Sequence, residues 1–278
     1  MQSINSIYFK NYLIFIHLFQ LSNNVFGTIS EPFSSFIREN FGNEAEKLLA
    51  RRDLGPGGSF GGGEIRLERS SNIEKLFKKS RIHHRPVILV HGLSTIAGEY
   101  ENIRQYFLFN GYSDNEVFGT SYSLESYIGQ KIQWSIRLML QAVTTYSNSQ
   151  VDVIGYSMGS PIARKAILGG RCVDTEEELG PPLTHLVHSF LGVAGANRDA
   201  VYLCKLLQYS YKNGYGPCNN VTGIRCHSRF LDDLNGENRS RFEASKRIYT
   251  IYSETDEIVG FKDCDGKYVS ELKAKTIL

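Results

Sequence analysis

Continuous apolar runs alternate with amphipathic segments over the second two thirds of the chain. The run Val87–Val90 is apolar at every position, so a strand there must be buried on both faces, which is typical of a parallel sheet covered by helices. Similar patterns predict further strands over residues 117–122, 151–154, 186–194 and 248–252, and helices over residues 33–49, 100–109, 127–146 and 158–168. This alternation predicts an α/β fold with a mostly parallel sheet and helices on both of its faces.

Two stretches lack such periodicity. Residues 55–63 are rich in glycine but lack the Gly-Lys-Ser/Thr sequence of a phosphate-binding loop, so we expect an ordered surface loop. Residues 197–247 are expected to form an irregular insertion, which is either functional and held by disulfides or simple surface decoration. The chain then divides into an N-terminal extension, residues 28–85, and a domain over residues 86–278 that contains the insertion.

The first 27 residues have the pattern of a secretory signal. Residues 12–21 form an apolar run that is too short to span a bilayer, which takes about 20 residues, and small residues precede a cleavage site after Gly27. A buried amphipathic helix is the alternative. Asn220 and Asn238 each begin an N-glycosylation sequon. We therefore expect a secreted glycoprotein.

The charge balance gives no reason to expect a polyanionic partner. The 278 residues include 31 Lys and Arg against 29 Asp and Glu, which leaves a formal net charge of +2. Hydrophobic residues make up 41% of the chain, a share that rules out intrinsic disorder. We expect a globular protein with a sizeable core that does not bind nucleic acid.

Five cysteines fit an oxidising compartment. None of them has the C-x-x-C spacing of zinc sites or redox motifs, so we expect disulfides and no metal. Among the pairings that the spacing allows, Cys218 with Cys226 closes a short loop and Cys172 with Cys204 makes a reasonable second pair. This pairing leaves Cys264 as the unpaired cysteine.

The strongest chemical signal is the sequence Gly155-Tyr156-Ser157-Met158-Gly159, which lies between a predicted strand and a predicted helix. A nucleophile at such a sharp turn has a strained backbone, and glycines two residues to either side are needed to avoid clashes. The turn places the hydroxyl group outside the sheet at the N-terminus of a helix. Ser157 is therefore the candidate nucleophile.

Acyl transfer also needs hydrogen-bond donors where the oxyanion develops. One donor is the backbone N–H of the residue after the nucleophile, here Met158. The second is expected from the loop after an early strand, where His91-Gly92-Leu93 follows the first apolar run. We assign it to the N–H of Leu93, and we interpret His91 as a structural residue.

The acid that orients the catalytic base is expected at the end of a later strand. The segment 253–260 follows the strand predicted over residues 248–252, and Asp256 is its best candidate, with Glu254 or Glu257 as substitutes. The simpler interpretation is a solvated acidic loop.

Five stretches together carry a family resemblance: DLGPGGSFGGG (53–63), PVILVHGLSTIAG (86–98), VDVIGYSMGSPIARKAILGG (151–170), LGPPLTHLVHSFLGVAGAN (179–197) and YSETDEIVG (252–260). The chain resembles the class 2 lipases, small bacterial lipases and their secreted nematode-type relatives. The resemblance implies an α/β-hydrolase fold, hydrolysis of carboxylic esters of lipids, and no metal or organic cofactor. It also implies that Ser157 is the nucleophile, Asp256 the acid, and Leu93 with Met158 the oxyanion hole.

The chain departs from that family in its histidines. In the family the catalytic His follows the Asp near the C-terminus, whereas all seven histidines here precede Asp256. The sequence ends at Leu278, about where the last strand before the His loop is expected. His185 and His188 open a strand and so belong to the opposite rim of the sheet from the catalytic groups. His227, in the insertion, is a weak candidate.

Two functions remain compatible with the sequence. The first is a secreted lipase or carboxylic ester hydrolase, incomplete or weakened because loss of one triad member can lower turnover by about 10⁴–10⁶-fold. The alternative is a catalytically inactive hydrolase fold that binds lipid or a protein partner through the same cleft. A peptidase or thioesterase would share the nucleophile. We expect a lipid ester as substrate and transient contact with a lipid surface.

Overall fold

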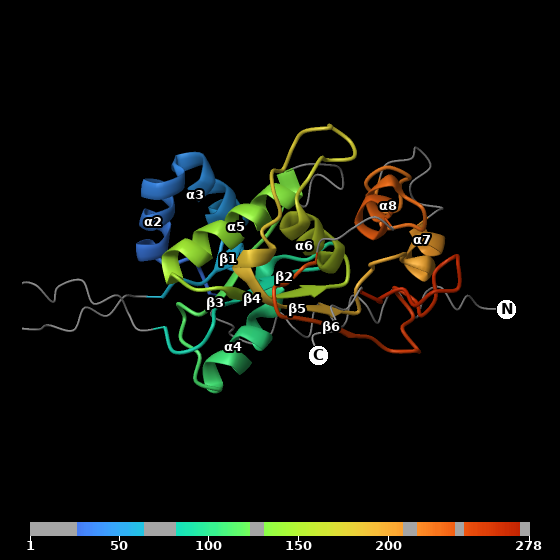
Figure 1. Ribbon diagram of the computed structural model, residues 1–278. Helices are drawn as coiled ribbons and strands as arrows, with labels where there is room; N and C mark the ends of the chain where they lie inside the picture. Colours follow the sequence, from blue (N-terminus) through green and yellow to red (C-terminus); the bar gives the residue numbers. More distant parts are fainter. Residues whose placement is uncertain (1–26, 64–81, 123–130, 208–215, 237–241, 273–278) are drawn as a thin grey trace, which may run out of the picture.

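The computed structural model describes residues 27–63, 82–122, 131–207, 216–236 and 242–272 (Figure 1). Residues 1–26 of the expected signal segment and the sequon at Asn238 lie outside these residues. Within the described part of the chain, no helix has the length and apolar character needed to cross a membrane.

A six-stranded sheet forms the centre of the molecule, in the order β1-β3-β2-β4-β5-β6. The strands are β1 (Ser59–Phe60), β2 (Val87–Val90), β3 (Val117–Thr120), β4 (Val151–Tyr156), β5 (Val187–Val193) and β6 (Arg247–Ile251). β2 to β6 run parallel, and β1 pairs antiparallel with β3. The predicted α/β fold with a mostly parallel sheet is confirmed.

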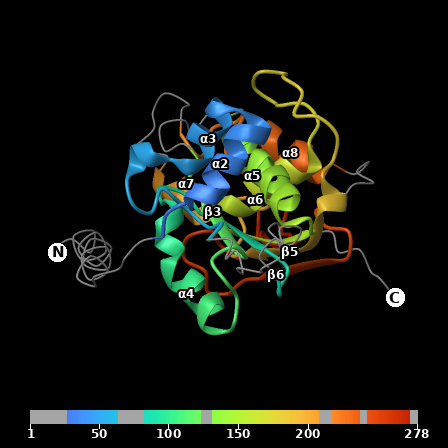
Figure 2. The ribbon, with the colours of Figure 1, turned by 90° about the vertical axis from the view of Figure 1, so that its left-hand side faces the viewer.

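One face of the sheet holds the main hydrophobic core. Ile88, Val153 and Phe190 form a fully buried row across neighbouring strands. Figures 1 and 2 show this face covered by α2 (Glu31–Phe41), α3 (Asn43–Ala50), α5 (Lys131–Ser147) and α6 (Gly159–Leu168). The apolar stripe of α5 packs here because its buried residues recur at helical spacing: Ile136, Met139, Leu140 and Val143.

The other face of the sheet is covered at one end by α4 (Glu101–Phe109), which lies on the opposite side from α5 and α6 (Figure 2). Phe107 and Leu108 of α4 pack with Val87 and Leu89 of β2. On this face the outer strand β6 is open among the described residues, with Tyr249 51% and Ile251 58% exposed. Helices thus lie on both faces, as predicted, although the second face is only partly covered.

The helix predicted over residues 33–49 is two helices, α2 and α3, so that prediction is wrong. Gly42 ends α2 at φ +91°, a left-handed value that only glycine adopts without steric cost, and α3 starts directly after it. The turn lets Phe33 and Ile37 of α2 and Leu49 of α3 enter the same core.

The glycine-rich stretch is not a surface loop, because its central residues are buried and include strand β1. A side chain at Gly61 would place its Cβ 2.7 Å from the Val117 carbonyl oxygen, and one at Gly62 would meet Phe33 at 2.3 Å. The glycines therefore serve close packing of the backbone against β3 and α2. The sequence alone did not indicate that β3 and α2 pack against these glycines.

The insertion also contains regular structure that its sequence pattern did not predict. α7 (Val201–Leu207) and α8 (Arg229–Asn235) lie within it. Ser228 caps α8 by accepting a hydrogen bond from the Leu231 N–H, and Phe230, Leu231 and Leu234 are buried. The described residues also include short 3-10 turns: η1 (Arg52–Leu54), η3 (Ala97–Tyr100) and η4 (Thr184–Leu186).

The predicted disulfide pairing is wrong. The bridges are Cys204–Cys218 and Cys226–Cys264, with Cα atoms 5.5 and 6.1 Å apart, and the remaining thiol is Cys172, which is buried. Cys264 pairs with Cys226 because the loop after β6 folds back beside the insertion. This contact cannot be deduced from the spacing of the cysteines in the sequence.

Candidate active site

Ser157 lies at the sharp turn between β4 and α6. Its φ is +52°, the left-handed region that a non-glycine residue occupies only under strain. The backbone around it is tightly held: the Ser157 N–H donates to the Val193 carbonyl, and its own carbonyl accepts from the N–H groups of Ser160 and Ala196. The strain at the turn is maintained by hydrogen bonds to β5 and to the loop that follows it.

The two glycines of the motif are needed for close approach. A Cβ on Gly155 would lie 2.7 Å from the Ser160 Cα, and a Cβ on Gly159 would lie 2.2 Å from the His91 carbonyl oxygen. Since such contacts are too short for real atoms, a side chain at either position would push α6 away from the sheet.

The loop after β2 lies directly beside the nucleophile. A Cβ placed on Gly92 would be 3.3 Å from the Ser157 Cβ. Leu93, the next residue, is half-buried, and Met158 is buried at the start of α6. The structure therefore brings together the three positions that the sequence assigned to the nucleophile and the oxyanion hole.

The Gly92 carbonyl is held by several donors on one side. It lies 2.9 Å from His91 Nδ1, 3.2 Å from the Thr95 hydroxyl and 3.1 Å from the Tyr122 hydroxyl. The C=O and N–H of a trans peptide point in opposite directions, so these bonds turn the Leu93 N–H to the other side of the loop. Nothing in the sequence pattern indicated this role for Tyr122 or Thr95.

His91 is a neutral structural residue. Its Nε2 accepts a hydrogen bond from the Tyr122 N–H at 3.1 Å, which places the ring proton on Nδ1, where it is donated to Gly92. The ring is 1% exposed, and burial lowers the pKa of His91 to about 4. It therefore orients the loop and is not available as a base at neutral pH.

Asp256 follows β6 in a half-exposed loop. Its Oδ1 accepts the backbone N–H groups of Ile258 and Val259, both at 2.9 Å, which fixes the direction of the carboxylate. Glu254 and Glu257 are exposed on either side of it. Together with Thr255 and Tyr202, these three acidic residues line an open cavity of about 310 Å³.

Ser157 and Asp256 follow the carboxyl ends of two parallel strands that have β5 between them. Strands two places apart in a sheet are about 10 Å apart. An imidazole with a hydrogen bond at each nitrogen bridges about 8 Å. The spacing of the two strands is thus close to the span of a hydrogen-bonded histidine, although Asp256 itself lies five residues beyond the end of β6.

Six histidines lie among the described residues, and none of these is hydrogen-bonded to Ser157 or Asp256. His188 is the second residue of β5 and lies near Asp152, at the amino-end rim, as predicted. His227 is exposed and lies between two other carboxylates, 3.2 Å from Asp265 and 3.6 Å from Asp232. The Asp265 carboxylate raises the pKa of His227.

Residues 84–277 match the sequence profile described as lipase (class 2). No curated protein sequence matches the chain.

Among solved structures, the chain is similar to lipase B of Aspergillus fumigatus, with 18% identity and a TM-score of 0.51 over 77% of this chain and 45% of that one. The mature lipase BlEst2 of Bacillus licheniformis matches with 14% identity and a TM-score of 0.41, over 61% of this chain and 68% of that one. The chain thus spans less than half the length of the Aspergillus lipase, and the likeness shows a shared fold.

Proposed function

The chain belongs to the class 2 lipase family, and from this premise we propose that it acts on carboxylic esters of lipids with Ser157 as the nucleophile. The observation that carries the proposal is the strained turn at Ser157 beside the loop of Gly92 and Leu93.

In the proposed reaction the Ser157 oxygen attacks the ester carbonyl, its proton passes to a base, and the oxyanion that forms accepts hydrogen bonds from the N–H groups of Leu93 and Met158. The intermediate then collapses to the acyl-enzyme, and the alcohol leaves with the proton that the base returns. The N-terminus of α6 adds its partial positive charge at the same place. Asp256 is the proposed acid, which would orient and stabilise an imidazolium. The acyl-enzyme is then hydrolysed by water.

A lipid substrate is supported by apolar side chains around Asp256. Tyr202 and Leu206 of α7 are 52% and 69% exposed, and Ile258 of the acid loop is 49% exposed. The Leu203 N–H donates to the Ile258 carbonyl, so α7 and the acid loop form one surface. Exposed apolar groups next to a catalytic rim suit transient contact with a lipid surface.

Secretion is part of the proposal and is supported by the two disulfides, which form and persist in oxidising compartments.

The test is ester hydrolysis by purified protein with a short-chain chromogenic ester. Ser157→Ala should remove the enzymatic rate, and Ser189→Ala, a serine near the start of β5, should leave it unchanged. Turnover by Ser157→Ala at the rate of the unchanged protein would refute the mechanism.

A second candidate function is lipid or protein binding without turnover. It is favoured by one observation: no described histidine is hydrogen-bonded to Ser157 or Asp256. Binding of a fluorescent fatty-acyl probe with no Ser157-dependent turnover would support it over the enzyme.

A further inference from the structure

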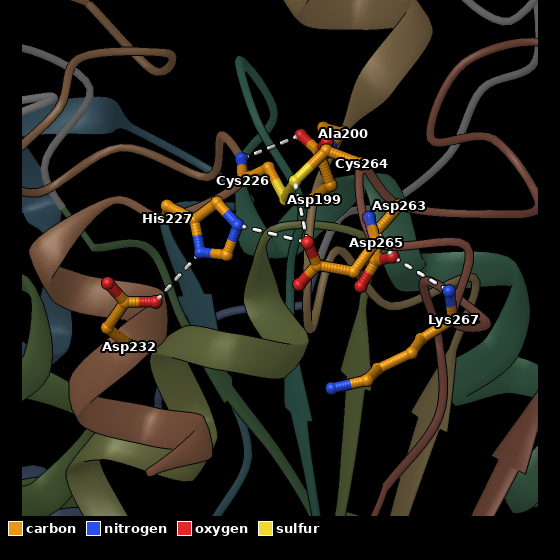
Figure 3. Close-up of a disulfide and its surroundings, with 9 residues drawn as sticks. All are labelled: Asp199, Ala200, Cys226, His227, Asp232, Asp263, Cys264, Asp265 and Lys267. Carbon is orange, nitrogen blue, oxygen red and sulfur yellow. Dashed lines mark hydrogen bonds and ion pairs between the residues drawn. A yellow bond between two sulfur atoms is a disulfide. The ribbon is translucent and has the colours of Figure 1, made fainter.

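A mixed cluster of potential metal ligands lies outside the proposed active site, where the insertion meets the loop after β6. It consists of two dipeptides, Cys226-His227 and Cys264-Asp265, whose ligand atoms all lie within 4.8 Å of one another (Figure 3). Within the described part of the chain, no other group of three or more such side chains comes this close. We name these four residues the Cys-His-Cys-Asp cluster.

We propose that this cluster is a redox-controlled zinc site: when the Cys226–Cys264 disulfide is reduced, the two thiolates bind Zn²⁺ together with His227 Nε2 and an Asp265 oxygen. A tetrahedral zinc with its usual bond lengths needs its ligand atoms about 3.3–3.8 Å apart. His227 Nε2 lies 3.2 Å from Asp265 Oδ1, and Cys264 Sγ lies 3.8 Å from the same oxygen. The two sulfur atoms, bonded in the disulfide, must separate.

The other nitrogen of His227 already lies near a carboxylate. A histidine that binds zinc usually donates its second ring N–H to a carboxylate, which fixes the tautomer and the direction of the ring. His227 Nδ1 lies 3.6 Å from Asp232 Oδ1 on α8, while Nε2 faces the cluster (Figure 3). Asp232 would thus act as the outer carboxylate.

The backbone of both dipeptides is held by groups that do not depend on the disulfide. The Cys226 N–H donates to the buried Asp199 carboxylate at 3.0 Å, and the Asp265 N–H donates to Asp263 Oδ1 at 2.9 Å. Lys267 N–H binds the same Asp263 oxygen at 2.8 Å and closes the turn around Cys264. Breaking the S–S bond therefore leaves the four ligands near one another.

The chemistry balances with a dithiol as reductant. The dithiol transfers two electrons and two protons, the S–S bond breaks, two thiols form, and the dithiol becomes a disulfide. Zn²⁺ then displaces the two thiol protons to solvent and binds both thiolates. The sequence showed no such site because its ligands come from dipeptides far apart in the chain and not from a C-x-x-C spacing.

The test is metal binding by the purified 278-residue protein, with Zn²⁺ and Co²⁺ as probes and a non-chelating phosphine as reductant. The reduced protein should bind one Zn²⁺, and the Co²⁺ form should show a thiolate-to-cobalt charge-transfer band. The oxidised protein should show neither. Asp232→Asn should weaken Zn²⁺ binding by about 10–100-fold, as outer-carboxylate changes do.

Two double variants distinguish metal binding at the cluster from metal binding by other cysteine thiols of the reduced protein. Cys204→Ser with Cys218→Ser removes the other disulfide and should retain the cobalt band, whereas Cys226→Ser with Cys264→Ser should lose it. His227→Ala should also lose it. Zn²⁺ should raise the melting temperature of the reduced protein. Any one of three results would overturn the proposal. The oxidised protein could bind Zn²⁺ as well as the reduced protein, the cobalt band could be unchanged in His227→Ala, or Zn²⁺ could neither bind nor stabilise the reduced protein.

Discussion

The rings of His91 and Tyr122 stack with their centroids 3.8 Å apart and an angle of 9° between their planes. The Tyr122 hydroxyl donates to the His91 carbonyl at 2.6 Å, and the Tyr122 N–H donates to His91 Nε2. The pair is buried between the ends of β2 and β3, one residue from the Gly92–Leu93 peptide. The His91–Tyr122 pair therefore sets the direction of the Leu93 N–H, the proposed donor to the oxyanion.

Tyr122→Phe should slow acylation without unfolding the protein. The substitution keeps the stacked ring but removes the hydroxyl that holds the carbonyls of His91 and Gly92, so the Leu93 N–H is less well oriented. Since loss of a whole oxyanion donor costs about 10²–10³-fold, we expect about a 10-fold lower rate of labelling of Ser157 by a fluorophosphonate. Tyr112→Phe is the matched control, because it removes the same hydroxyl group from a tyrosine that also stacks on a histidine. That histidine is His84, which precedes the amino end of β2, away from the loop at its carboxyl end. Equal labelling by the two variants would contradict the role of Tyr122.

His91 should make the fold sensitive to acid. Its pKa is about 4 when folded and about 6.5 when unfolded. As the pH falls from 6.5, the unfolded chain takes up a proton that the folded chain does not. Stability that is complete above pH 6.5 is therefore lost as the pH falls toward 4, by about 3 kcal/mol in total. An NMR titration should find the ring neutral at pH 5. A midpoint near 6.5 in the folded protein would show that the ring is not buried as described.

Gly159→Ala should destabilise the protein by about 1–3 kcal/mol or more, because the new Cβ would lie 2.2 Å from the His91 carbonyl oxygen. Gly236→Ala is the control: its Cβ would meet its nearest neighbour at an ordinary 3.4 Å. Urea unfolding of the two variants measures the difference. Equal stability would mean that α6 can move away from β2 at little cost.

Denatured, unreduced protein should contain one titratable thiol, Cys172. In the native protein that thiol should react slowly, because it is 4% exposed and burial raises its pKa. Removal of the Cys204–Cys218 bridge should cost about 3 kcal/mol, the value for a loop of this length. Peptide mapping of the intact bridges is the direct check, and a Cys172–Cys204 peptide would restore the pairing that the sequence suggested.

Ester turnover by the 278-residue protein should be slow and should rise when free imidazole is added. The reason is that no histidine among the described residues is hydrogen-bonded to Ser157, so added imidazole can supply the base. The rate seen with Ser157→Ala in the same buffer is subtracted, because imidazole itself cleaves activated esters. Fast turnover without imidazole that His227→Ala abolishes would show that His227 reaches the site after all.

The sequence by itself predicted the five parallel strands of the sheet and the sharp turn at Ser157. The run Val87–Val90 is apolar at every position and so requires burial on both faces, which allowed its strand to be predicted without knowledge of its neighbours. The turn at Ser157 could also be predicted from a short stretch of sequence, because its two glycines and the flanking strand and helix lie within a few residues of it.

Tertiary structure decided whatever depends on partners distant in the chain. Burial of the glycine-rich stretch follows from the backbone of β3, more than fifty residues away. Cys264 meets Cys226 because the loop after β6 folds back on the insertion. The support of Gly92 by Tyr122 and the meeting of His227 with Asp265 arise in the same way. Periodicity reports which face of an element is buried, and it carries no information on which distant residue lies against that face.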